Sequence, residues 1–444
     1  MTFQEFGNIK SVSGFMLNAQ TVMINTLENF FGASVSLNYY PLQGFKVKFN
    51  IDITNEPKRN YYRVDEPDEM TLLVVFVEQQ DNRFYLGIQL ASPQLRYYDT
   101  SIFNSACVSI GLALTKASMG SFRSFVSLFN ESLAKDIVIR DLGKGHYDVH
   151  KIAYLTDLFL GLRSTTFEGK NFSTGLIITK SNYAYNRADD FQKNGRIVQL
   201  AVPTMEIDIF NQLKTRSWFL ADGYRSFYLT DLKKPIKRMF VYNGEDDDYV
   251  GDMLLSKTLL GADALFRVSH GRELSIINSG GHEFLHQENK WKFRDYNALK
   301  SCILNKMPDL KGFYDVLIKC VLSCSKTDTS SIIWLPKDIN TIKEIVIEKT
   351  MNEFSRYPIK LTDPTNMPIV KRLLSSDGAT VIDKDGKIRF FACFADLSKA
   401  NTGGIRGTGE TAATLLSQNG IAIKVSQDGP IKVFLEGAKG YIPF

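Results

Sequence analysis

Hydrophobic and polar positions along the chain follow two spacings, and each spacing predicts one kind of secondary structure. Segments that alternate apolar and polar residues, or that are short and continuously apolar, predict β-strands. They cover residues 47–53, 71–77, 84–90, 175–179, 238–242, 331–335, 421–425 and 431–435, together with a hairpin at 380–394 that turns at 384–386. Segments whose apolar residues recur every three or four positions predict helices at 102–117, 314–322, 339–354, 369–374 and 411–417. Strands interleaved with helices predict a multidomain α/β protein whose C-terminal mixed β-sheet is flanked by helices.

The length of the chain, 444 residues, exceeds what one hydrophobic core usually supports, so we expect several domains. We place an N-terminal α/β domain at 1–155, a middle α/β domain at 156–310 and a third domain at 311–444. The first two domains carry no catalytic signature that assigns them a role.

Composition narrows the class of protein. The formal net charge is +5, and Lys and Arg are dispersed among Asp and Glu, which argues against a protein that coats nucleic acid. No apolar run reaches the roughly 18 residues of a membrane span, and the first six residues do not resemble a signal peptide. Five cysteines without a regular spacing are typical of a reducing compartment. We therefore expect a cytoplasmic protein with no membrane partner, in which Cys320 and Cys324 are core thiols on one helical face.

One short motif, His282-Glu283-Phe284-Leu285-His286, matches the zinc-protease pattern. In that pattern a helix holds both imidazoles on the metal and aims the Glu at a metal-bound water. Here two glycines precede the motif, and residues 287–293 have the pattern of a turn followed by a returning strand. We therefore predict a hairpin, in which the two His side chains do not share a helical face, and we do not favour a protease.

A glycine-rich segment, residues 403–409, leads into the predicted helix near the C-terminus. Glycines let the backbone approach an anion closely, and a helix start presents unpaired N–H groups and a positive dipole end. Arg406 can add a charge-assisted contact to phosphate, and Thr408 can cap the helix or bind an oxygen. Asp377, just before the predicted hairpin, can hold a divalent cation that bridges the phosphates. An ordinary surface loop would show the same glycines, so the segment alone does not establish a site.

Three motifs in this region, taken in order, resemble the diadenylate cyclase domain, the nucleotide-binding module of the DNA-integrity-scanning cyclases. They are Asp377-Gly378-Ala379, Gly407-Thr408-Gly409-Glu410-Thr411-Ala412-Ala413 and Ser426-Gln427-Asp428. The resemblance covers about residues 325–444. That family condenses two ATP molecules into cyclic di-AMP by bringing two active sites face to face, so an active member would form a homo-oligomer.

The resemblance implies roles for residues of these motifs. Asp377 would be the catalytic acid that binds Mg²⁺ or Mn²⁺, and Asp428 would be a second metal ligand, because Gln427 stands where the family has Glu. The residues that would bind the adenine nucleotide are Gly378, Ala379, Gly404, Arg406, Gly407, Thr408, Gly409, Glu410, Thr411 and Ser426.

The chain departs from the family at its basic triplet. The family's Arg-His-Arg is here Gly409, Glu410 and Thr411. Losing two guanidinium contacts forfeits about 1.5–3 kcal/mol each, and Glu410 would repel a polyphosphate. Efficient cyclisation of ATP is therefore not expected, because phosphoryl transfer depends on positioning and charge neutralisation.

These observations predict a sensor or regulatory protein, in a bacterial nucleotide-signalling or defence context, that binds an adenine nucleotide or a cyclic dinucleotide. One alternative is an active nucleotidyltransferase in which Arg406, or a Lys from another domain or subunit, replaces the missing charges. Another is a structural or adaptor protein that keeps a vestigial fold.

Overall fold

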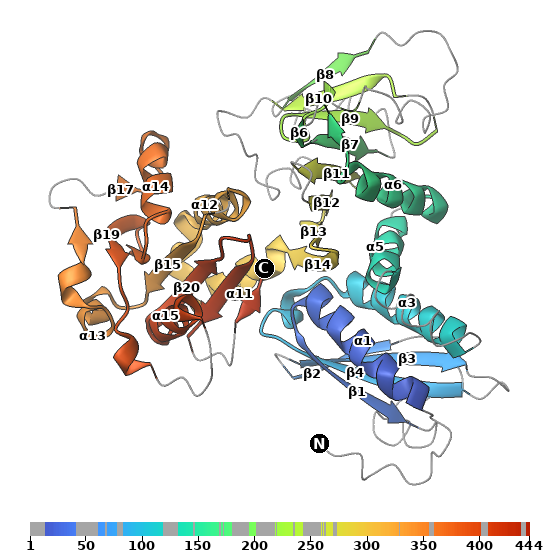
Figure 1. Cartoon of the computed structure of the whole chain (residues 1–444), viewed down its shortest axis with the longest axis horizontal. Helices are drawn as coiled ribbons and strands as arrows, with labels where there is room; N and C mark the ends of the chain where they lie inside the picture. The colour runs from blue at the N-terminus through green and yellow to red at the C-terminus, as the bar shows by residue number, and fades with distance from the viewer. Residues whose placement is uncertain are drawn as a thin grey trace. The chain divides into compact units, whose positions relative to one another are not determined.

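A computed structural model describes most of the chain (Figure 1). The described residues are 14–40, 61–66, 69–77, 83–118, 132–144, 147–167, 170–171, 173–179, 195–200, 218, 220–233, 236–242, 259, 261, 263–269, 273–327, 329–354, 359–400, 407–436 and 441–444. The chain divides into two compact units, Met1–Tyr296 and Asn297–Phe444. Each unit has its own sheets and helices, which confirms the predicted multidomain α/β class.

The first part of the N-terminal unit is a four-stranded antiparallel sheet with the strand order β1-β4-β3-β2. Its strands are β1 (Ser34–Tyr40), β2 (Tyr61–Glu66), β3 (Glu69–Val77) and β4 (Arg83–Ala91), and α1 (Gly14–Phe31) and α3 (Thr100–Ser118) pack on it. The β3–β4 register runs from Glu69 opposite Ala91 to Val77 opposite Arg83, so the predicted hairpin is confirmed, as is the helix predicted at 102–117. The strand predicted at 47–53 lies outside the described residues.

The second part of this unit is an eight-stranded sheet with the order β14-β13-β12-β11-β7-β9-β10-β8. Its strands are β7 (Thr174–Ile178), β8 (Gly195–Gln199), β9 (Ser226–Thr230), β10 (Arg238–Tyr242), β11 (Ala264–Ser269), β12 (Glu273–Asn278), β13 (His282–Gln287) and β14 (Lys290–Asp295). Helices α5 (Leu133–Gly143) and α6 (Val149–Leu162) connect the two sheets in sequence, and β5 (Thr166–Phe167) pairs with β6 (Lys170–Asn171). Phe30 of α1 stacks on Phe293 of β14 with 6.0 Å between ring centroids, so an aromatic core joins the two sheets.

The C-terminal unit contains a mixed sheet with the strand order β16-β19-β18-β15-β20-β21-β22, in which β17 also pairs with β19. The strands are β15 (Ser331–Pro336), β16 (Asn352–Glu353), β17 (Ile359–Lys360), β18 (Ala379–Ile382), β19 (Lys387–Cys393), β20 (Gly420–Val425), β21 (Ile431–Leu435) and β22 (Ile442–Pro443). Only the β15–β18 pair is parallel among these described strands. The helices are α11 (Tyr296–Lys306), α12 (Tyr314–Lys326), α13 (Ile342–Ile345), α14 (Met367–Leu374) and α15 (Thr408–Leu416).

The two faces of this sheet pack against different helices. Side chains alternate between faces along a strand, and one face carries Trp334 and Ala422, which form a buried cluster with Ala413 and Leu416 of α15. On the other face α12 and α14 pack on β20 and β15. The predicted mixed sheet flanked by helices is therefore confirmed.

The helix predicted at 339–354 is wrong. The segment is instead a 3₁₀ turn (Ile339–Thr341), the four-residue α13, a second 3₁₀ turn (Glu348–Thr350) and the edge strand β16. Val346 forms a β-bridge with Ala395, and the Ile347 N–H donates to the Phe394 carbonyl at 2.9 Å. The β-branched run at 345–347 favours this pairing over a helix, because such side chains lose rotamer freedom in a helix.

All five cysteines are free and buried, which confirms that Cys320 and Cys324 belong to the core. Burial raises the pKa of the Cys324 thiol to about 11. Within the described ranges no helix combines the length and the apolar character needed to cross a bilayer.

Candidate functional site

The zinc-protease motif lies on a β-strand. His282 to His286 belong to β13, which pairs with β14 through a tight turn where Glu288 and Asn289 have φ of 51° and 59°. Four residues of a strand span about 13 Å, so the two imidazoles cannot bind one metal ion. Among the described residues no group of three or more His, Cys, Asp or Glu side chains is placed to hold a metal. The predicted hairpin is confirmed.

The side chains of this motif serve the packing of the sheet. The fully buried Glu283 carboxylate accepts from Ser275 Oγ at 2.5 Å, Tyr296 Oη at 2.7 Å and Arg294 Nη1 at 3.2 Å. Burial disfavours the charge of Arg294, but Glu283 outweighs it and the pKa of Arg294 lies above its ordinary value. Such a cluster fixes the register of β12, β13 and β14, because a mismatched register would leave a buried charge unpaired.

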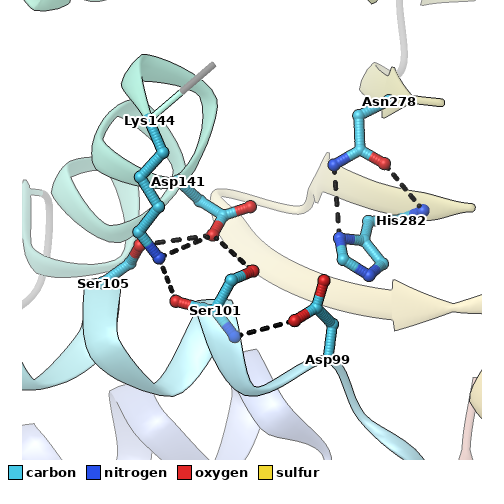
Figure 2. Close-up of polar contacts among 7 residues, drawn as sticks. All are labelled: Asp99, Ser101, Ser105, Asp141, Lys144, Asn278 and His282. Carbon is cyan, nitrogen blue, oxygen red and sulfur yellow. Dashed lines mark hydrogen bonds and ion pairs between the residues drawn. The ribbon is translucent and has the colours of Figure 1, made fainter. Parts of the chain in front are cut away.

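A second polar cluster in the N-terminal unit also holds elements together (Figure 2). The Asp141 carboxylate of α5 accepts from Ser105 Oγ of α3 at 3.2 Å and from Lys144 Nζ at 3.3 Å. Asp99 accepts from the Ser101 N–H at 2.8 Å, as a carboxylate at a helix start does. These contacts tie α3 to α5 and give no arrangement of a nucleophile with a base.

The candidate site lies at one edge of the C-terminal sheet and is defined by the strand register. Ala379 of β18 lies opposite Ile332 of β15, Ile332 lies opposite Lys424 of β20, and Lys424 lies opposite Lys432 of β21. Since neighbouring strands are about 4.8 Å apart, the row from Ala379 to Lys424 spans about 10 Å. The starts of β15, β18 and β21 and the end of β20 therefore lie along one side of the sheet, where these strands begin or end. We call this side the motif edge.

Asp377, two residues before Ala379, lies at the motif edge. Its carboxylate is exposed and accepts from the Gly378 N–H at 2.9 Å. Gly378 has φ of +91°, and a Cβ there would come within 2.8 Å of the Cys393 carbonyl oxygen. This motif therefore requires glycine for its backbone, while Ala379 is buried. Asp377 is exposed and Gly378 is half-buried.

Helix α15 begins at the same edge. Gly407 is its N-cap, with no side-chain cap, and the N–H groups of Glu410 and Thr411 donate to the Gly407 carbonyl at 3.0 Å. Thr408 is exposed and follows the cap, so of the two roles predicted for Thr408 the capping role is wrong, and the contact to a ligand oxygen stays a prediction. A Cβ on Gly407 would meet nothing within 4 Å among the described residues, so a side chain could be added at that position.

Two lysines lie beside the helix start and were not predicted as site residues. The stem of Lys424 crosses Gly409, where a Cβ would come within 2.7 Å of Lys424 Cε, and Lys424 Nζ donates to Ser426 Oγ at 3.0 Å. Lys432 forms an ion pair with Glu410, and its ammonium lies 4.5 Å from the centroid of the Tyr441 ring. Lys432 therefore partly neutralises the charge of Glu410. The sequence alone gives Glu410 no such partner.

The environment shifts the two lysines in opposite directions. Partial burial and then the positive charge of Lys432 lower the pKa of Lys424, although Glu410 and Asp428 oppose this. Partial burial also disfavours the charge of Lys432, but the hydrogen bond with Glu410 and the neighbouring Tyr441 outweigh it, so the pKa of Lys432 is raised. A ligand anion at Lys424 would relieve the repulsion between the two ammonium groups.

The β20–β21 turn completes the motif edge. The Ser426 N–H donates to the Pro430 carbonyl at 2.9 Å, and Ser325 Oγ of α12 donates to the Gly429 carbonyl at 2.5 Å. These bonds hold Ser426 beside Lys424 and leave Asp428 exposed.

The structure brings together most of the residues that the sequence predicts for the site. Those at the motif edge are Asp377, Gly378, Ala379, Gly407, Thr408, Gly409, Glu410, Thr411, Ser426 and Asp428. Gly404 and Arg406 lie outside the described residues. Lys424 and Lys432 were missed, although each is the polar residue of an otherwise apolar predicted strand.

Comparisons with known proteins give weak similarities. No family model and no curated protein sequence matches the chain. Among solved structures, a hypothetical membrane spanning protein from Bacillus cereus aligns with 33% of this chain and 74% of its own, at 17% identity and a TM-score of 0.25. A double mutant of DacA from Staphylococcus aureus aligns with 30% of this chain and 89% of its own, at 16% identity and a TM-score of 0.24. The relation to diadenylate cyclases that the motifs predict therefore stays a prediction.

Proposed function

We propose that the C-terminal unit binds an adenine nucleotide or a cyclic dinucleotide at the motif edge and acts as a sensor or regulatory module. One observation carries the proposal. The strand register aligns Ala379, Lys424 and Lys432; the exposed Asp377 precedes Ala379 by two residues, and the start of α15 lies against Lys424 at Gly409. The backbone N–H groups in the first turn of a helix bind phosphate oxygens, and so do lysine ammonium groups.

The same residues supply the parts of a nucleotide site. Asp377 would hold a Mg²⁺ or Mn²⁺ ion together with phosphate oxygens and water, as is usual where one or two carboxylates bind such ions beside a substrate phosphate. The ion would neutralise phosphate charge. Asp428 is the second proposed metal ligand, and Ser426 and Thr408 would donate hydrogen bonds from their hydroxyl groups.

Slow or absent turnover follows from the residues at the helix start. Gly409, Glu410 and Thr411 supply no positive charge, and Lys432 is already paired with Glu410. A transferring phosphoryl group needs positive charge held in place. We therefore favour binding and signalling over synthesis.

Isothermal titration calorimetry of the full chain tests this proposal. With ATP, ADP and cyclic di-AMP in the presence of Mg²⁺, at least one ligand should bind, and Asp377→Ala should weaken that binding by about tenfold or more. Asp385→Ala is the matched control, because Asp385 is an exposed carboxylate in the turn at the other end of β18. No heat with any of the three ligands would reject the proposal.

An active nucleotidyltransferase is the second candidate, and the lysine pair favours it. Lys424 stands on the same motif edge as Asp377 and can replace one charge of the missing basic triplet, and Lys432 can replace a second if it leaves Glu410. Such an enzyme would convert ATP to cyclic di-AMP or a related product with Mn²⁺ and would self-associate. Absence of any new nucleotide by chromatography, after incubation of pure protein with ATP and Mn²⁺, would rule it out.

A further inference from the structure

The ion pair between Glu410 and Lys432 occupies a position where an anionic ligand would be expected. Both side chains are largely covered, with 25% and 21% of their surface exposed. Glu410 lies in the first turn of α15, where a carboxylate is favoured by the helix dipole. Lys432 is the direct cross-strand neighbour of Lys424. The carboxylate of Glu410 thus neutralises one of the two ammonium groups that face the helix start.

The charges at this position can be counted. Lys424 and Lys432 contribute two positive charges, and Glu410 contributes one negative charge that is bonded to Lys432. The immediate cluster therefore carries a net charge of one positive unit. Asp428 adds a further negative charge that acts on Lys424, so the four side chains taken together are neutral. A phosphate diester group carries about one negative charge, and the two such groups of cyclic di-AMP are apart from each other, whereas the charges of a nucleoside triphosphate lie on adjacent phosphates.

We propose that Glu410 is an internal competitor for an anion site formed by Lys424, Ser426 and Lys432, and that it makes this site select phosphate diesters over polyphosphates. This inference rests on the proposed function, since it names the ligand class of the same site. A diester group can bind Lys424 and Ser426 and leave the ion pair in place. A polyphosphate must displace Glu410 from Lys432 or accept its repulsion.

An ordinary surface ion pair is the simpler account, and it makes a different prediction. Such a pair contributes little to stability. Removing its carboxylate then changes the affinity for an anion only because the net charge of the C-terminal unit becomes more positive. Competition instead requires that the gain from removing Glu410 depend on Lys432. The two accounts therefore separate in a double-mutant cycle.

Inorganic pyrophosphate and cyclic di-AMP are the probes for calorimetry on the full chain. Removing one unit charge about 6 Å from a bound anion changes affinity by about threefold in water and about a hundredfold at an effective dielectric constant of 20. We expect Glu410→Gln to bind pyrophosphate about tenfold more tightly than the wild type. Cyclic di-AMP affinity should change by no more than about threefold, because the diester group at the site carries about one charge where pyrophosphate carries about three.

Two further variants control the experiment. Glu436→Gln removes the same charge from an exposed ion pair with Lys337, at the other end of β21, and should leave pyrophosphate affinity within about twofold, as exposed and distant charges are largely screened. Lys432→Met should abolish the gain of Glu410→Gln in the double variant. Thermal denaturation of each variant identifies any that fails to fold.

The outcomes separate the inference from the proposed function. If Glu410→Gln binds pyrophosphate no better than Glu436→Gln, or if the gain persists without Lys432, the inference is overturned, whether or not nucleotides bind. If the gain appears and depends on Lys432 while no nucleotide binds the wild type, the anion site stands and the proposed function fails.

Discussion

The substitution Gly409→Ala should detach Lys424 from the motif edge without disturbing the fold. The added Cβ would come within 2.7 Å of Lys424 Cε, which is closer than van der Waals contact allows. The lysine side chain is flexible, so it can move away from the added methyl group. The ammonium group then loses its hydrogen bond to Ser426 Oγ, which is 3.0 Å long in the wild-type chain. Alanine is also the better helix former, by up to about 1 kcal/mol.

The expected effect on binding follows from the contact that is lost. A hydrogen bond to a charged group contributes about 1.5–3 kcal/mol, which corresponds to about ten- to hundredfold in dissociation constant. Calorimetry with the best-binding nucleotide measures this loss, and thermal denaturation should show an unchanged or slightly higher Tm. Gly312→Ala is the matched control, because a Cβ at Gly312 meets nothing within 4 Å.

The reasoning fails if Gly409→Ala binds the nucleotide as tightly as Gly312→Ala does. It also fails if Lys424→Met, which removes the ammonium directly, leaves binding unchanged. A variant that unfolds would show that the stem of Lys424 cannot move aside, and the Lys424→Met result would then decide whether this lysine contacts the ligand.

Three further predictions concern stability, each measured by chemical denaturation of the full chain. Burial and then the positive charge of Arg163 lower the pKa of His286 to about 4, so the folded chain resists a proton that the unfolded chain accepts below about pH 6.5. The free energy of unfolding should therefore fall as pH drops from about 6.5 to 4, by about 2 kcal/mol at pH 5. The variant His286→Gln should remove this loss. The control variant His150→Gln changes an exposed histidine and should keep the loss. Glu283→Gln leaves the charge of Arg294 buried and should cost about 3 kcal/mol, and a cost below about 1 kcal/mol would contradict the buried cluster. Gly378→Ala combines positive φ with a 2.8 Å contact to backbone and should cost about 2 kcal/mol or more, whereas a neutral effect would mean that the β18–β19 backbone is not held as described.

The strands of the C-terminal sheet could be predicted from the sequence because local signals agree with the fold. In the hairpin 380–394, two apolar segments flank the turn at 384–386, and Gly386 adopts the positive φ of 73° that its turn requires. The segment 339–354 shows the limit of this approach. Its apolar residues Ile342 and Val346 are buried as the helical spacing predicts, yet pairing with residues near 394 replaces the helix. Spacing identified the buried face, while long-range pairing decided the backbone conformation.

The candidate site was predictable where its residues are close in sequence. Asp377 and Gly378 form a recognisable motif, and the helix start near Thr408 was placed within a few residues. The partner of Glu410 was not found, because Lys432 lies 22 residues away on another element. A signal was present, however. Pairing the predicted strands 421–425 and 431–435 across the turn at 428–429 sets Lys424 opposite Lys432.

Hydrogen–deuterium exchange of the full chain, with and without the nucleotide that binds best in calorimetry, tests most directly where the ligand binds. We predict slower exchange for the backbone amides of residues 407–411 and 426–430, since a bound phosphate shields the start of α15 and the β20–β21 turn. Slower exchange confined to residues 1–296, with these two segments unchanged in a ligand-saturated sample, would contradict a nucleotide site at the motif edge.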